Sequence, residues 1–232
     1  GSRVAVLKDG ELMQVDTPQM LFDAPDNLFV ATFIGSPAMN LVEAKLVRDG
    51  GPGLVFADHK VALPEQVVAE RQGLDRYFDQ QLIIGLRPSS LEDAAFVSDA
   101  RPRIKGEVAV TEELGSEVNV IFHMAAPQVH HEIMIAKFDK AAKDEVEAEE
   151  LAGEGQSLWT ARVNPKTQAK VGRSIDLAVD ASGFHFFDAD TGQAIGRVTE
   201  GEGARGRREA LASSHTDITS DGNGSSRADR LR

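Results

Sequence analysis

Three histidines and a glutamate come nearest to metal chemistry in this sequence. His130 and His131 are adjacent, Glu132 follows them, and His123 lies seven residues before His130. The zinc-protease pattern H-E-x-x-H is not met, because Ile135 stands where its second histidine must be. Neighbouring residues of a strand point to opposite faces, so His130 and His131 cannot easily share one metal ion. We expect histidines on a half-exposed sheet. A site completed by His123 is the alternative.

A run of acidic side chains could hold a cation. Residues 144–154 contain six acids and no base. Calcium loops need alternating oxygen ligands and a glycine at the sharp turn, whereas alanine and leucine interrupt this run. We therefore expect a solvated helix or loop, inserted between strands as an acidic segment at 139–155.

Phosphate chemistry has little support. The phosphate-loop pattern G-x-x-x-x-G-K-[ST] does not occur in the sequence. Residues 201–206 (GEGARG) spell G-x-G-x-x-G, but a dinucleotide site needs that motif between a strand and a helix, and here it lies in a polar tail. No serine has the G-x-S-x-G setting of a hydrolase. The sequence predicts no catalytic residue, no metal site and no cofactor site in this chain.

Composition excludes further classes. The formal net charge is −12, which disfavours binding to nucleic-acid phosphates. The chain has no cysteine, so it can form neither disulfides nor thiolate metal sites. Apolar runs are only as long as strands, far below the ~20 residues that span a bilayer.

The elements that position these residues are read from turn signals and periodicity. Asp9-Gly10 between two β-branched runs predicts a hairpin over 3–16. Thr17-Pro18 opens a helix to residue 23, and a second helix is expected over 27–34. Short strands follow from residue 41, with a helix over 64–80 and a further strand over 130–136. We expect a mainly β fold with a few helices, built as a small barrel.

The first 40 residues resemble one family. The strings are 3–10 (RVAVLKDG), 14–18 (QVDTP), 21–25 (LFDAP) and 27–40 (NLFVATFIGSPAMN). They resemble the segment after the switch histidine in ATP-binding subunits of sugar importers of the maltose, glycerol-3-phosphate and trehalose type. The acidic segment and the tail depart from the pattern, in the style of actinobacterial members.

Weaker likenesses follow in the same order along the chain. Residues 85–88 (GLRP) are similar to the family's Gly-Ile-Arg-Pro-Glu turn, with Ser89 in place of the glutamate, and residues 113–117 (ELGSE) resemble its Glu-x-Leu-Gly-x-Glu turn. Residues 187–192 (FDADTG) resemble its last hairpin. From the first two likenesses we select six candidate contacts with a partner subunit or regulator: Gly85, Arg87, Pro88, Glu113, Gly115 and Glu117.

The resemblance implies an organisation. Residues 1–36 correspond to the end of a nucleotide-binding domain, 37–198 to an OB-like (TOBE) regulatory domain, and 199–232 to a disordered tail. The ATPase motifs, with ATP and Mg²⁺, are expected upstream of this chain. Phe22, Leu28, Phe29 and Phe33 are expected to expose apolar surface to that upstream part.

The resemblance also implies a function. The chain is expected to be a non-enzymatic regulatory and dimerisation domain of a carbohydrate importer's ATPase. Its expected partners are a second copy, the upstream ATPase domain, membrane permease subunits and a regulatory protein, with no nucleic acid. The expected location is cytoplasmic, at the inner face of the plasma membrane.

A stand-alone module that binds a sugar or an oxyanion is the alternative. Related β modules bind such ligands between paired units. The acidic charge disfavours an oxyanion, and with one Trp and one Tyr in the chain no aromatic cluster for sugar stacking is evident.

Overall fold

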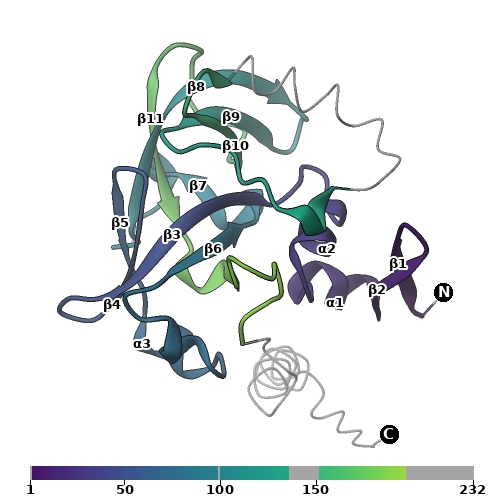
Figure 1. The fold of residues 1–232 in the computed structure, drawn as a ribbon. Coiled ribbons are helices and arrows are strands. Elements are labelled where there is room, and N and C mark those ends of the chain that lie inside the picture. Colours follow the sequence, from purple (N-terminus) through teal and green to yellow (C-terminus); the bar gives the residue numbers. More distant parts are fainter. Residues whose placement is uncertain (1, 99, 136–151, 197–232) are drawn as a thin grey trace, which may run out of the picture. The chain divides into compact units, whose positions relative to one another are not determined.

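A computed structural model describes residues 2–98, 100–135 and 152–196. Residues 139–151 of the acidic segment and the tail from residue 199 lie outside the described residues. The predicted mainly β fold is confirmed: two five-stranded antiparallel sheets dominate the described part (Figure 1). No helix within those ranges is long and apolar enough to cross a membrane.

The chain starts with the predicted hairpin and two short helices. Strands β1 (Val4–Lys8) and β2 (Glu11–Asp16) pair antiparallel. Helix α1 (Pro18–Asp23) begins after Thr17, whose side chain accepts a hydrogen bond from the Met20 N–H. Helix α2 (Leu28–Phe33) is capped in the same way by its preceding asparagine. Such caps satisfy N–H groups that a helix leaves unpaired at its start.

The first large sheet has the strand order β12-β6-β3-β4-β5. Strand β3 is central and pairs with both β4 and β6. Its burial alternates over most of its length, as expected where one face of a sheet packs on a core. The bounds are β3 (Asn40–Arg48), β4 (Pro52–Phe56), β5 (His59–Ala62), β6 (Gln81–Leu86) and β12 (Phe184–Phe187).

The second sheet has the order β10-β9-β8-β11-β7. Strand β8 is the longest and contains a register shift between Val108 and Val110, which marks a β-bulge. Strand β7 was not expected from the sequence. The bounds are β7 (Leu91–Asp93), β8 (Arg103–Glu113), β9 (Val118–Met124), β10 (Ser157–Val163) and β11 (Ser174–Val179).

One hydrophobic core draws side chains from both sheets. At its centre the Trp159 ring of β10 stacks on Phe56 of β4, with 6.0 Å between ring centroids. Phe122 of β9 meets the same indole edge-on at 6.3 Å. The two sheets are therefore joined by aromatic packing that neither could form alone.

A second core joins the N-terminal helices to the sheet. Leu28 and Ala31 of α2 pack with Met39, Ile83 and Phe187. Main-chain hydrogen bonds support this packing, since the Leu28 N–H donates to the carbonyl of Gly192 at 2.9 Å. Residues 1–36 thus share buried surface with the strands that follow them.

Two expected elements are wrong in extent or type. The helix predicted over 64–80 is two pieces, α3 (Glu65–Ala69) and the 3₁₀ turn η1 (Leu74–Tyr77), because Gly73 adopts a positive φ of 85° between them. The strand predicted over 130–136 is not formed in its described part, where the 3₁₀ turn η4 (Glu132–Met134) stands instead. Further short 3₁₀ turns are η2 (Pro88–Ser90), η3 (Ala94–Phe96) and η5 (Ala181–Gly183).

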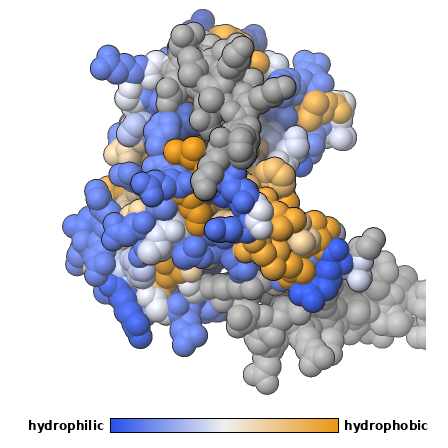
Figure 2. All heavy atoms as spheres, turned by 45° about the vertical axis from the view of Figure 1, so that its right-hand side comes forward, coloured by the Kyte–Doolittle hydropathy of each residue, from blue (hydrophilic) through white to orange (hydrophobic). Residues whose placement is uncertain are grey.

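The expected apolar surface is also corrected in part. Leu28 and Phe29 are buried by this chain itself, whereas Phe33 is 65% exposed. Hydrophobic side chains gather on the face turned forward in Figure 2, the side of α2 and the β1–β2 hairpin in Figure 1. The exposed large apolar residues of the hairpin are Val4, Leu7 and Leu12.

Candidate functional site

The candidate site is a junction, where the end of α2 meets the start of β3 and the end of β6. Strand pairing sets Asn40 opposite Leu86 and Leu41 opposite Gly85. The end of the string 27–40 and the residues 85–88 therefore lie side by side. Each polar or glycine position in them has a specific contact.

Arg87 ties the N-terminal helices to the sheet. Its side chain is buried, and its guanidinium donates to the carbonyls of Ala31, Ile34 and Phe22. The first two acceptors lie at the C-terminal end of α2, where helix carbonyls lack partners within the helix. One rigid, forked group thus holds both helices, a geometry that an arginine provides and a lysine does not.

Among the residues that the structure describes, the hydrogen bonds of the Arg87 guanidinium all go to main-chain carbonyls and none to a carboxylate. Burial lowers the pKa of Arg87 to about 10, while the charge of Asp23 acts in the opposite direction. The group therefore stays protonated at neutral pH. Gly35 makes room for it, since a Cβ built there would lie 2.9 Å from Arg87 Nη1 and the residue has a φ of +124°.

Gly85 lies inside strand β6 and not in a turn. A Cβ at this position would overlap the Met39 side chain and approach the Phe187 ring to 3.2 Å. Glycine is needed here because another side chain occupies the space above its backbone. Pro88 is buried as well and opens η2. Gly85, Arg87 and Pro88 are thus internal packing residues. Contact with a partner stays a prediction for them.

Asn40 connects the two sheets through one amide. Its Oδ1 accepts from the Thr160 N–H at 2.7 Å, and its Nδ2 donates to the Thr160 carbonyl at 2.8 Å. The side chain thereby imitates a neighbouring strand along the outer edge of β10. Asn40 was not among the residues predicted to be functional. Its place at the end of the string 27–40 is the signal that could have found it.

The turn after β8 is linked to the junction by Arg162. Glu117 forms an ion pair with Arg162, with 3.1 Å between Oε1 and Nε. Arg162 also donates to the Ser36 carbonyl at 2.9 Å. Glu113 and Gly115 are exposed, and Gly115 has a positive φ of 86° that the turn requires. The structure thus connects both predicted contact groups, although their role as an interface stays a prediction.

The histidines do not converge. His131 belongs to a local hydrogen-bond arrangement, since its Nδ1 accepts from the Ile133 N–H at 3.1 Å and its Nε2 lies 3.2 Å from the Asp190 carbonyl oxygen. Within the described ranges, no group of three or more metal-ligating side chains is found. The alternative of a metal site completed by His123 therefore gains no support.

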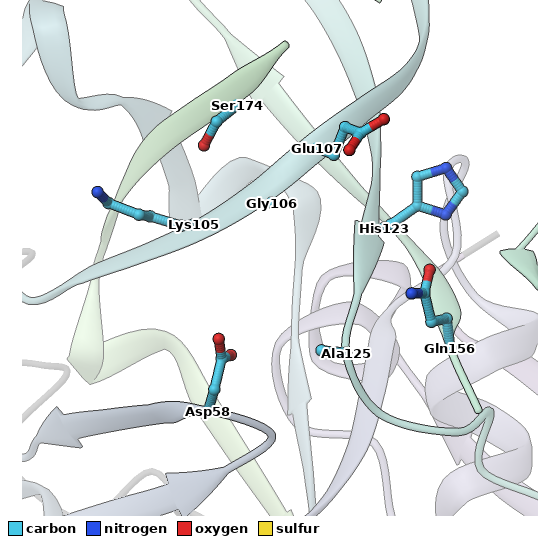
Figure 3. A pocket seen from close by; sticks show the side chains of 8 residues that line it. All are labelled: Asp58, Lys105, Gly106, Glu107, His123, Ala125, Gln156 and Ser174. Atoms are coloured by element: carbon cyan, nitrogen blue, oxygen red, sulfur yellow. The ribbon is translucent and has the colours of Figure 1, made fainter. Parts of the chain in front are cut away.

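His123 instead lines a polar hollow of about 430 Å³ (Figure 3). Glu107 projects beside it from β8, as their cross-strand pairing requires. Lys105 lies further along β8, and Asp58 reaches in from the β4–β5 turn. Charges of both signs around this open hollow partly cancel, so it selects strongly for neither anions nor cations.

Comparison with known proteins settles what this fold is. Residues 35–91, from the end of α2 to the start of β7, match the family model "MalK OB fold domain". This part of the chain is similar to MalK OB fold domains. The OB-like fold expected from the sequence is confirmed.

The curated relatives are ATP-binding subunits of importers. The chain is 36% identical to the trehalose import ATP-binding protein SugC of Mycobacterium tuberculosis, over 83% of this chain and 47% of SugC. It is 31% identical to the trehalose/maltose import ATP-binding protein MalK of Thermococcus litoralis, over 84% of this chain and 44% of that protein. The oligosaccharides import ATP-binding protein MsmX of Bacillus subtilis is 29% identical, over 82% and 43%.

The chain therefore spans slightly less than half the length of these relatives. A solved structure of the cytoplasmic molybdate-binding protein ModG, with molybdate bound, covers 63% of this chain at 13% identity and a TM-score of 0.39. That resemblance is too weak to bear on function.

Proposed function

We propose that this chain is the regulatory and dimerisation part of the ATP-binding subunit of a bacterial carbohydrate ABC importer. The alignment with less than half of each relative supports this, because the remaining half has room for an ATPase domain. In the proposed protein that ATPase domain binds ATP and Mg²⁺, and this chain binds neither. The subunit works at the inner face of the plasma membrane, bound to permease subunits.

The junction is the observation that carries the proposal. Arg87 fixes α1 and α2 to the OB fold domain, so a movement of the helices must be passed on to the strands. The Glu117–Arg162–Ser36 chain extends this rigid connection to the turn after β8. A permanent contact between two such domains keeps two ATPase domains at high effective concentration while they open and close. A regulator that binds one arrangement better then shifts the cycle.

Self-association of this chain tests the proposal. We expect a dimer in sedimentation-velocity experiments, weakened at least tenfold by Glu113→Arg at the exposed turn. Phe33→Ser is the control for association through the apolar face of α2, and it should leave the dimer unchanged. A chain that stays monomeric at every concentration, or a dimer that only Phe33→Ser disrupts, contradicts the proposed dimerisation role.

A further inference from the structure

Strand β8 carries opposite charges at its two ends. Arg103 stands at its start and Glu112 and Glu113 stand at its end, and all three side chains are exposed. At ~3.3 Å per residue the two ends lie roughly 30 Å apart in one continuous sheet. The acidic end therefore cannot reach the basic end of its own chain.

A hollow of about 400 Å³ lies at the basic end of β8. Arg103 of β8, with Lys170 and Arg173 of the loop before β11, contributes the basic side chains of its lining. The loop is fixed to the strand, because the Val108 N–H donates to the Arg173 carbonyl at 2.9 Å and the Gly172 N–H donates to the Val108 carbonyl at 2.8 Å. Three basic groups are thus held around one opening, which we call the basic hollow.

The two acidic residues that line the basic hollow already have partners. Asp93 accepts hydrogen bonds from the Ala95 N–H and the Thr167 hydroxyl. Asp176 forms an ion pair with Lys105, with 3.5 Å between Oδ1 and Nζ. Within the described ranges, the three basic side chains of the hollow form no ion pair with a carboxylate. In a chain of net charge −12, this local excess of positive charge favours an acidic occupant.

The other end of β8 leads into an exposed turn, residues 112–117, which we call the acidic turn. Glu113 is exposed there, and the Leu114 side chain beside it is 52% exposed. The turn is held in one conformation, since the Leu114 N–H donates to the Glu117 carbonyl at 2.9 Å and the Glu117 carboxylate is paired with Arg162. A preformed turn of this kind loses little conformational freedom when it binds.

We propose that the acidic turn of one copy binds in the basic hollow of a second copy, and that the second copy's turn binds in the hollow of the first. Glu113 then meets Arg173 and its basic neighbours. Leu114 covers the apolar part of the lining, which is formed by Ala94, Ala95 and Ala169.

A second copy fits this surface better than an unrelated acidic protein does. Turn and hollow lie at opposite ends of the same strand, so one two-fold arrangement satisfies both contacts and closes the dimer. An unrelated acidic protein would fill the hollow alone and leave the turn uncovered. This contact rests on the proposed dimerisation and assigns the two surfaces that form it.

Charge reversal on each surface, followed by mixing, tests the contact in the 232-residue chain. Glu113→Arg and Arg173→Glu should each weaken the dimer about tenfold when studied alone by sedimentation velocity. An equimolar mixture of the two variants should dimerise about fivefold more tightly than either alone, because the reversed turn of one meets the reversed hollow of the other and the second contact is native. Arg76→Glu, at an exposed arginine of η1, is the matched control and should leave the dimer unchanged.

The outcomes separate this contact from the dimerisation role. A parent chain that stays monomeric at every concentration contradicts both. A parent dimer whose variants do not recover on mixing overturns the contact alone. So does a dimer that Arg76→Glu weakens as strongly as Arg173→Glu, and so does a dimer that Arg173→Glu leaves unchanged, in which case the hollow is left to a different acidic protein. Lys170→Glu replaces Arg173→Glu if that variant loses its folded far-UV spectrum.

Discussion

The guanidinium carbon of Arg87 lies 4.1 Å from the centre of the Phe22 ring, while Nη2 of the same group donates to the Phe22 carbonyl at 2.8 Å. One side chain thus holds one residue through both its ring and its main chain. The Phe22 ring covers one face of the Arg87 guanidinium and shields its charge from water.

Arg87→Met should detach the helices from the OB fold domain. The change leaves three main-chain carbonyls without their donor, and we expect the free energy of unfolding to fall by about 3 kcal/mol. Urea denaturation measures the loss, and hydrogen exchange should show faster exchange in α2 than in β3. Arg48→Met is the control, because Arg48 also stacks on a phenylalanine ring but at the surface, and it should cost under about 1 kcal/mol.

Gly85→Ala should be more damaging than its single added methyl group suggests. The new Cβ overlaps the Met39 side chain inside a packed core, which we expect to cost about 1–3 kcal/mol. Gly115→Ala serves as the comparison, since a Cβ there meets nothing within 4 Å and only the positive φ is strained. Addition of Met39→Ala should recover part of the Gly85→Ala loss. Strictly additive losses would show that Met39 is not the obstacle.

Asn40→Asp should weaken the contact between the sheets. A carboxylate still accepts from the Thr160 N–H, but it cannot donate to the Thr160 carbonyl and would face that oxygen with negative charge. We expect a loss of about 1–3 kcal/mol in the free energy of unfolding. The same substitution at Asn164 is the control, because this half-buried side chain only accepts a local hydrogen bond, from the Lys166 N–H at 2.9 Å, and a carboxylate can still accept it. A loss at Asn40 no larger than at Asn164 would contradict the bridging role.

The sequence predicted the local elements better than the contacts between them. The hairpin at Asp9-Gly10 and the two helix starts depend on turn and cap residues that are close neighbours in the sequence. They can therefore be predicted from the sequence alone. The break at Gly73 was missed because an isolated glycine also fits inside a helical pattern. The contacts of Arg87, Gly85 and Asn40 join residues 40 to 120 positions apart, and no periodicity encodes them.

The six candidate residues show the same limit. Their selection came from a resemblance to known turns, which identifies positions but not whether a side chain points inward. Arg87 is an arginine followed by proline, a pattern that is usually exposed, yet the helices before it bury the side chain. A cavity of about 410 Å³ beside Phe33 was not predicted for a related reason, since the residues that line it come from α2 and β10, which are more than 120 positions apart.

Acid sensitivity should depend on His185. The residue lies opposite Gly85 in β12, and burial together with the charges of Arg87 and Arg71 lowers the pKa of His185 from 6.5 to about 3. Above pH 6.5 His185 is neutral in both folded and unfolded chains and contributes no pH dependence. Between pH 6.5 and pH 3 the unfolded chain binds a proton that the folded chain does not, so stability falls as the pH falls.

The expected size of this effect from pH 7 to pH 5 is up to about 2 kcal/mol, since each pKa unit of difference corresponds to ~1.4 kcal/mol. His185→Gln removes the titration while keeping a polar side chain of similar size. Urea denaturation at a series of pH values should therefore give a shallower acid slope for His185→Gln than for the parent chain. Parallel slopes would mean that His185 is protonated in the folded protein, which the two neighbouring arginines oppose.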